Sequence, residues 1–151
     1  MKAVLQRVKY STVKIDGETV GKCDGGFMIL LGVESGDTEK DSDKLVNKIP
    51  NLRVFEDENG KMNLSLLDTD GELLVISQFT LCADCTHGRR PSFTKSAPPA
   101  EAERLYEYFV DSLKKSGVKS VQTGKFGADM QVELLNDGPV TIILDSKELH
   151  W

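Results

Sequence analysis

The stretch Phe27-Met28-Ile29-Leu30-Leu31-Gly32-Val33, which Gly25-Gly26 introduces, is the longest continuous apolar run in the first half of the chain. A strand that faces solvent on one side alternates apolar and polar residues. An unbroken run of this length therefore predicts a strand that is buried on both faces. We expect the fold to be built around this strand.

The residues before this run predict one strand followed by a two-stranded hairpin. Residues 4–9 alternate apolar and polar side chains, as a half-buried strand does. Residues 11–15 and 18–22 then flank Asp16-Gly17, a dipeptide that favours a two-residue hairpin turn.

The residues after the run predict two helices, several strands and one long loop. Helices are expected at 37–49, capped by Asp37 or Thr38, and from Pro98-Pro99 to about Gly117, where apolar residues recur at helical spacing. The other predicted strands are 52–55, 72–80, 130–135 and 140–144, and residues 82–97 are expected to form a loop. The order predicts a mixed α/β fold: two layers of largely antiparallel or mixed sheet, with the two main helices covering one side.

Composition limits the class of protein. The 151 residues suit one domain, 1–151, and no apolar run is long enough to span a bilayer. The first ten residues lack the apolar core of a signal peptide, so we expect a soluble cytoplasmic protein without a membrane partner. A net charge of −5 gives no general attraction for nucleic acid, so any contact with nucleic acid must be local.

The first segment that could carry chemistry is Ser77-Gln78-Phe79-Thr80-Leu81, at the end of a predicted apolar strand. Exposed backbone N–H groups at such a position can stabilise the oxyanion that forms during ester hydrolysis. The alternative is a strand that simply becomes polar as it leaves the core.

The second segment is Asp137-Gly138-Pro139, which pattern alone interprets as a turn between two strands. However, Pro139 directly precedes the apolar run Val140–Leu144, and strands seldom begin so abruptly. About 5–6% of X–Pro bonds in folded proteins are cis. If this bond is cis, the carbonyl groups of Gly138 and Pro139 can point the same way and form a rigid pocket wall without side chains.

The long loop carries two further candidates. Arg89 and Arg90, with Phe93 and Lys95, suit contact with phosphates and bases, although a solvated loop is an equal interpretation. The C-x-x-C motif of Cys82 and Cys85, followed by His87, lacks the second half of a zinc site. We therefore expect no metal and no cofactor. With only two histidines in the chain, a Ser-His-Asp triad is not expected either.

Taken together, Ser77–Leu81 and the segment Asn136-Asp137-Gly138-Pro139-Val140-Thr141 resemble the two signature motifs of the D-aminoacyl-tRNA deacylase family. The resemblance extends from end to end of the chain. It also includes the segments Met1–Val8, Gly88–Phe93, Ala97–Pro99 and Phe126–Met130. Cys82 and Cys85 occupy loop positions where the family pattern does not lead us to expect a cysteine pair.

The resemblance implies a barrel-like pair of sheets with flanking helices. It also implies a homodimer in which each active site lies at the subunit interface. One subunit would supply Ser77, Gln78, Phe79 and Thr80. The other would insert a cis Gly138-Pro139 that Arg7 holds in place. The same resemblance suggests that Phe126 and Met130 contact the substrate.

The activity implied is hydrolysis of the ester that joins a D-amino acid to tRNA. Carbonyl groups of Gly138 and Pro139 would exclude an L side chain, whereas a D side chain points away and glycine also fits. Either the Thr80 hydroxyl or the 2′-hydroxyl of the terminal adenosine would assist the attack. We favour the second, because the sequence places no general base beside Thr80. The rival interpretation is a non-catalytic dimeric module that binds a D-amino acid or a nucleotide.

Overall fold

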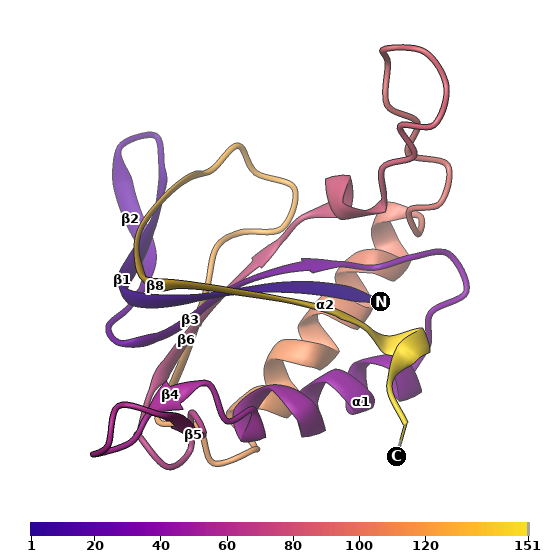
Figure 1. Ribbon diagram of the computed structural model, residues 1–151. Coiled ribbons are helices and arrows are strands. Elements are labelled where there is room, and N and C mark those ends of the chain that lie inside the picture. The colour runs from indigo at the N-terminus through magenta and orange to yellow at the C-terminus, as the bar shows by residue number, and fades with distance from the viewer. Residues whose placement is uncertain (151) are drawn as a thin grey trace.

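The computed structural model describes residues 1–150, and six of its strands form one mixed sheet (Figure 1). The sheet order is β2-β1-β3-β6-β7, and β8 pairs with β1. These strands are β1 (Lys2–Ile15), β2 (Glu18–Cys23), β3 (Gly26–Gly32), β6 (Glu72–Ser77), β7 (Ser120–Thr123) and β8 (Gln131–Asp145). A separate hairpin of β4 (Phe55–Glu56) and β5 (Met62–Leu64) forms a second, small sheet.

The long strand β1 turns the sheet into a nearly closed barrel. Its first half pairs with β3, its second half pairs with β2, and β8 follows its other edge. This arrangement brings β2 beside β7, where the Lys22 amide donates to the Gln122 side chain at 2.9 Å. Gly21 is required at this approach, because a Cβ there would collide with the Thr123 carbonyl oxygen.

The predicted doubly buried strand is confirmed. In β3, the side chains of Phe27, Ile29 and Leu31 belong to the core beneath the helices, whereas Met28 belongs to a second core inside the barrel. The parallel neighbour β6 divides its side chains in the same way. Alternation along one strand thus supplies both cores, and neither face is left for water.

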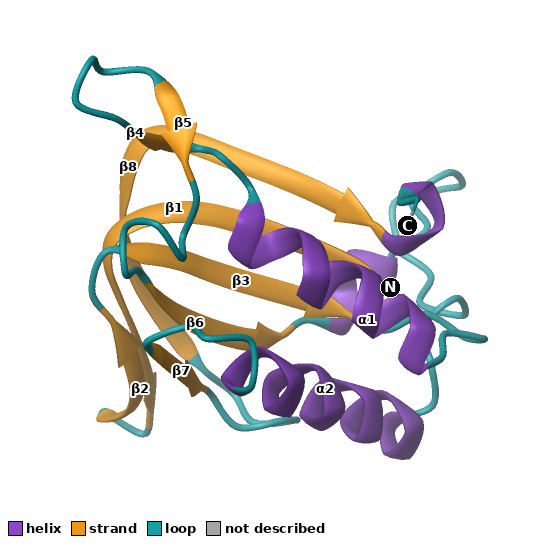
Figure 2. Cartoon of the chain, turned by 90° about the horizontal axis from the view of Figure 1, so that it is seen from below, coloured by secondary structure: helices purple, strands orange, loops and turns teal. Residues whose placement is uncertain are grey.

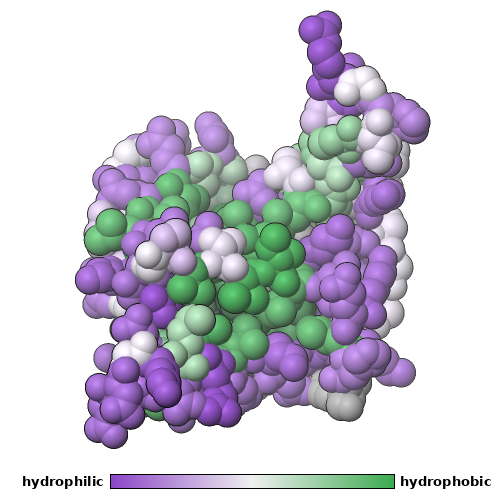
Figure 3. Space-filling model, viewed as in Figure 1, coloured by the Kyte–Doolittle hydropathy of each residue, from purple (hydrophilic) through white to green (hydrophobic). Residues whose placement is uncertain are grey.

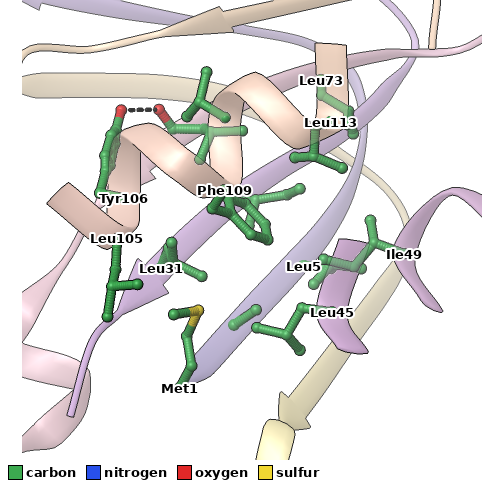
Figure 4. Packing of buried hydrophobic residues seen from close by; sticks show 14 of the residues in the cluster. Met1, Leu5, Leu31, Leu45, Ile49, Leu73, Leu105, Tyr106, Phe109 and Leu113 are labelled. Atoms are coloured by element: carbon green, nitrogen blue, oxygen red, sulfur yellow. Dashed lines mark hydrogen bonds between the residues drawn. The ribbon is translucent and has the colours of Figure 1, made fainter. Parts of the chain in front are cut away.

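Helices α1 (Glu39–Lys48) and α2 (Pro99–Lys114) lie side by side against one face of the sheet (Figure 2). The predicted mixed α/β fold, with two main helices on one side, is therefore confirmed. Phe109 and Leu105 of α2 are fully buried in the core between helices and sheet, and the Tyr106 hydroxyl donates to the Val75 carbonyl oxygen at 3.0 Å (Figure 4). Within the described residues, no helix is long and apolar enough to cross a membrane.

The start of α1 and the first hairpin follow the predicted signals. Thr38 is the N-cap of α1, and its amide donates to the Asp41 carboxylate at 2.9 Å, which satisfies one otherwise unpaired donor. Asp37, the other predicted cap, instead accepts from the buried amino group of Met1 at 2.9 Å. The hairpin turn at Asp16-Gly17 has positive φ at both residues, as its sequence predicts.

Several predicted boundaries were wrong. The strand predicted at 52–55 begins only at Phe55, and β7 was not predicted, because its partner β6 supplies pairing that local pattern does not reveal. The strand predicted at 72–80 ends at Ser77, where the chain enters the 3-10 turn η2 (Phe79–Cys82). The two strands predicted at 130–135 and 140–144 are one strand, β8, because β1 offers a continuous partner along most of its length. Short 3-10 turns also follow α1 and β8, at η1 (Ile49–Asn51) and η3 (Ser146–Glu148).

Candidate active site

A cavity of about 840 Å³ opens where β6 ends. Its wall comes from the ends of β3 and β6, the loop that precedes α2, the first turn of α2 and the segment that enters β8. The lining residues are Leu31, Val33, Ser35, Ile76, Ser77, Gln78, Phe79, Phe93, Thr94, Ser96, Ala97, Pro98, Pro99, Ala102, Phe126, Gly127, Ala128, Met130 and Val132.

The cavity wall contains no ionisable side chain: among the described residues, no Asp, Glu, His, Cys, Lys or Arg lines it. Its polar groups are hydroxyls, one side-chain amide and the backbone. General acid or base catalysis by a side chain requires a titratable group within hydrogen-bonding distance of the reacting atoms. The cavity can therefore hold and polarise a ligand, but it does not itself supply a proton donor or acceptor of that kind.

The turn η2 presents backbone donors beside this cavity. The Gln78 amide continues the pairing of β6 by donating to the Leu31 carbonyl oxygen at 2.8 Å, and the chain then leaves the sheet. The next two amides, of Phe79 and Thr80, have no hydrogen-bond acceptor among residues 1–150. The side-chain amide of Gln78 donates to the Thr80 hydroxyl oxygen. Free N–H groups at the start of a helical turn are donors that a negatively charged oxygen can accept from.

The loop of residues 83–96, which we call the arm, rises away from the body of the molecule (Figure 1). Asp84 and Ser92 exchange backbone hydrogen bonds of 2.7 and 2.9 Å, which closes the arm below its exposed tip. Hydrogen bonds from the Thr86 hydroxyl and amide hold the pKa of Asp84 below its ordinary value. Near the base of the arm, the ring of Phe93 lies edge-on to Phe79, with ring centroids 5.1 Å apart.

The cysteines occupy different environments. Cys82, the last residue of η2, is buried, and its thiol lies 3.6 Å from the Val33 carbonyl oxygen. Burial raises the pKa of this thiol. Cys85 is exposed in the arm, Cys23 is buried in the barrel, and all three are free. In the part of the chain that the structure describes, no three His, Cys, Asp or Glu side chains come together in a way that could hold a metal ion.

The second signature segment forms a bulge in β8. Gln6 pairs with Thr141 and Val8 pairs with Asn136, so residues 137–140 have no partner on β1 and stand out from the sheet. The Gly138-Pro139 peptide bond in this bulge is cis. The prediction of a plain turn between two strands was therefore wrong.

Hydrogen bonds from Arg7 support the bulge. Its buried guanidinium donates to the Asp137 carbonyl oxygen at 2.9 Å and to the Val54 carbonyl oxygen at 2.6 Å. Gly138 has φ +131°, and a Cβ there would lie 3.1 Å from the Arg7 side chain. Both the conformation and the contact therefore favour glycine at this position.

The structure brings only some of the predicted site residues together. Ser77, Gln78, Phe79, Phe126 and Met130 line the cavity. Thr80 lies on the same turn without lining the cavity, and Arg89, Arg90 and Lys95 lie on the arm outside it. Gly138, Pro139 and Arg7 do not line the cavity of their own chain.

Sequence reasoning missed part of the wall. The sequence predicts nucleic-acid contact for Phe93 and no site role for Thr94, Ser96 or Ala102, yet all four line the cavity. The signal that was available is the position of Pro98-Pro99: a helix that starts directly after a long loop brings the end of that loop back to the sheet.

Comparison with known proteins identifies the family. Residues 4–145 match the sequence model of the family described as D-Tyr-tRNA(Tyr) deacylase. A D-aminoacyl-tRNA deacylase of Thermosipho africanus is 58% identical over 149 residues, with 99% of each chain covered. A protein of the same name from Geotalea uraniireducens is 60% identical over 146 residues, with 97% of this chain and 94% of that protein covered.

Solved structures share the fold. A c-Myc DNA Unwinding Element Binding Protein superposes with a TM-score of 0.91 at 44% identity, covering 96% of this chain and 98% of that one. A probable eukaryotic D-amino acid tRNA deacylase gives a TM-score of 0.81 at 15% identity, with 95% and 98% covered, which bears on the fold alone. With both signature segments in place and a match over nearly its whole length, the chain belongs to the D-Tyr-tRNA(Tyr) deacylase family.

Proposed function

We propose that the chain hydrolyses the ester bond of D-aminoacyl-tRNA, releasing the free D-amino acid and tRNA. The observation that carries this proposal is the pair of unpartnered N–H groups of Phe79 and Thr80 beside a cavity without ionisable side chains. An aminoacyl ester is already activated, so stabilising its tetrahedral oxyanion is the main help that it needs.

The proposed reaction uses a group of the substrate in place of a side-chain base. A water molecule attacks the ester carbonyl carbon while the 2′-hydroxyl of the terminal adenosine orients it. The carbonyl oxygen gains negative charge and accepts hydrogen bonds from Phe79 and Thr80. The bond to the 3′-oxygen then breaks, and the proton lost by the water passes to that oxygen. Thr80, whose hydroxyl oxygen already accepts from Gln78, is not required as the nucleophile.

Selection against L-amino acids is proposed to come from a second copy of the chain. Gly138 and Pro139 stand in an outward bulge and do not line their own cavity, which supports placing them opposite a substrate bound in the cavity of a second copy. An L side chain would collide with their carbonyl groups, whereas a D side chain or the hydrogen of glycine would not. The proposed assembly is therefore a homodimer with both active sites at the interface.

The surface supports a second copy. Figure 3 shows apolar side chains gathered across the middle of the face on which β8 lies. On β8 itself, the side chain of Ile143 is 74% exposed, and β8 pairs on one edge only. Apolar surface of this kind marks a protein interface more often than a solvated face.

Contact with tRNA is proposed to be local and to involve Arg89, Arg90 and Lys95 on the arm. The tip of the arm is exposed. Lys95 is already paired with Asp84 at 3.8 Å, so Arg89 and Arg90 are the cations of the arm best placed to bind a phosphate. Few phosphate contacts predict a shallow dependence of binding on salt. We further propose that residues 1–151 act as one domain and that the protein works in the cytoplasm, where aminoacyl-tRNA is made.

The test is hydrolysis of D-tyrosyl-tRNA and L-tyrosyl-tRNA in parallel by purified, metal-free protein. We expect rapid loss of the D ester, with the L ester spared. Hydrolysis of both esters would support the esterase activity but reject selection by Gly138 and Pro139. Loss of neither ester, from a folded protein that still binds the substrate, would favour the rival binding module.

A further inference from the structure

Different parts of the molecule hold the backbone of the turn η2 and the side chain of Phe79. The backbone packs on β3 on both sides of the two donors: the Gln78 amide donates to the Leu31 carbonyl oxygen at 2.8 Å, and a Cβ at Gly32 would lie 3.1 Å from the Gln78 carbonyl oxygen and 3.0 Å from Leu81. The first half of the turn carries Phe79, whose side chain is 54% exposed although its amide is the proposed oxyanion donor. The hydrogen bonds at the two ends of the turn, from the Leu81 amide to the Gln78 carbonyl oxygen and from the Ala83 amide to the Thr80 carbonyl oxygen, are 3.3 and 3.2 Å long.

The aromatic neighbour of Phe79 is Phe93, which belongs to the arm. The two rings meet edge to face, with centroids 5.1 Å apart and planes at 68°. This arrangement places the positive edge of one ring against the negative face of the other, so it fixes orientation as well as distance. Phe93 therefore supports the exposed ring of Phe79, whereas β3 supports the backbone on either side of it.

Phe93 is itself linked to the charged tip of the arm. The residue before it, Ser92, is hydrogen-bonded to Asp84, and the Phe93 carbonyl oxygen accepts from the Ser96 amide at 3.0 Å. Only Pro91 and Ser92 separate Phe93 from Arg90, and proline fixes one backbone dihedral of this short connection. A nucleic-acid backbone bound by Arg89 and Arg90 would thus restrict the motion of Phe93.

We infer that Phe93 is a positioning residue that couples binding of the tRNA body by the arm to the orientation of the Phe79 and Thr80 amides. When the arm is engaged, Phe93 holds Phe79 and the two donors point at the ester carbonyl. The inference rests on the proposed deacylase function. It adds that contact remote from the ester raises the rate of the chemical step and not the affinity alone.

The experiment compares Phe93→Leu, which keeps apolar volume, with Phe93→Tyr, which keeps the ring. Single-turnover rates at saturating enzyme are measured on D-tyrosyl-tRNA and on D-tyrosyl-adenosine, which has the same ester without the tRNA body. For Phe93→Leu we expect a rate on the order of tenfold lower on D-tyrosyl-tRNA, and a clearly smaller loss on D-tyrosyl-adenosine. Phe93→Tyr should restore the rate on D-tyrosyl-tRNA.

A matched control and a second pair of variants keep the test decisive. Leu67, on the surface away from the cavity, has the same 37% exposure as Phe93, and Leu67→Ala should leave both rates unchanged. The double variant Arg89→Ala/Arg90→Ala should slow D-tyrosyl-tRNA hydrolysis in the wild-type background and add little to Phe93→Leu. The effect of the arginine variant in the wild-type background does not depend on how well Phe93→Leu folds, because the arginines are exposed.

The outcomes separate this inference from the proposed function. If wild-type protein hydrolyses D-tyrosyl-tRNA but Phe93→Leu slows both substrates equally, or changes affinity alone, or changes nothing, the coupling is rejected and the deacylase function stands. If the arginine variant and Phe93→Leu have additive effects, the coupling is also rejected. If wild-type protein hydrolyses neither substrate, the proposed function itself fails.

Discussion

At the scale of single residues, the candidate site depends more on backbone groups than on side chains. The Phe79 and Thr80 amides remain in almost any substitution, and the Gly138-Pro139 bulge presents carbonyl groups to its surroundings. Side chains such as Arg7 and Gln78 act by holding these backbone groups in place. Substitutions are therefore expected to affect geometry before they affect chemistry.

Thr80→Ala is expected to retain most of the deacylation rate, within about tenfold of wild type, because the Thr80 amide remains. Removal of a true nucleophile costs a factor of about 10⁴ or more in well-studied hydrolases. Single-turnover hydrolysis of D-tyrosyl-tRNA at saturating enzyme measures the difference. A loss on the order of 10⁴ in a variant that still binds the substrate would identify the hydroxyl as the nucleophile and reject the substrate-assisted reaction.

Arg7→Ala is expected to lower both stability and selectivity. It removes donors to the carbonyl oxygens of Asp137 and Val54 in a buried position, which costs roughly 1–3 kcal/mol in the free energy of unfolding. The bulge then loses its support, so the ratio of D to L hydrolysis should fall. Arg53→Ala is the matched control, since Arg53 is exposed and bonds to Asn63. An unchanged D to L ratio in Arg7→Ala would show that the bulge does not need Arg7.

At the scale of elements, the local sequence pattern predicted those elements whose signal lies within a short stretch of the chain. The apolar run 27–33, the hairpin at Asp16-Gly17 and the second helix each carry a complete signal within a few residues. The strand β7 carries no such signal, because it is defined by pairing with β6. The candidate site was predictable in the same uneven way: the signature segments single out residues 77–81 and 136–141, but the sequence does not predict the turn η2, and only packing places Phe93 against Phe79.

The two cores predict how stability responds to alkali. Burial, with the nearby charge of Glu72, raises the pKa of Cys23 inside the barrel from 9.0 to about 12. Burial also raises the pKa of Tyr106 on α2 from 10.0 to about 12. Above pH 9 the unfolded chain loses these protons before the folded chain does, so the free energy of unfolding falls as pH rises toward 12.

Cys23→Ala should therefore show a smaller loss of stability between pH 9 and pH 12 than wild type. The difference is at most about 1.4 kcal/mol per pH unit, the limit for one linked proton. Urea unfolding across this range measures it, and Cys85→Ala, which removes an exposed thiol, serves as the control. Equal slopes for Cys23→Ala and wild type would mean that the Cys23 thiol does not contribute.

At the scale of the whole molecule, the two signature segments lie apart within one chain. The cavity is bounded by η2, the arm and the start of α2, whereas the Gly138-Pro139 bulge stands out from β8. A second copy that covers the exposed Ile143 would complete the site and protect the open edge of β8. Assembly and activity are then properties of the same surface.

Ile143→Asp is expected to give a folded monomer without deacylase activity, because a charge on this face opposes burial in an interface. Sedimentation velocity reports the oligomeric state, and circular dichroism reports the fold. Met62→Asp places the same charge on an exposed apolar position of the β4–β5 hairpin and should leave the assembly unchanged. A dimeric and fully active Ile143→Asp variant would place the interface elsewhere.

The unpartnered amides of η2 have a consequence for inheritance. Nineteen of the twenty encoded amino acids carry a backbone N–H, so nearly every missense change at codon 79 or codon 80 leaves the donor itself in the protein. Only a proline codon deletes it. The proposed chemistry thus depends on the conformation of the main chain, and few single-nucleotide changes remove the donors. Selection then acts mainly on the residues that maintain this conformation.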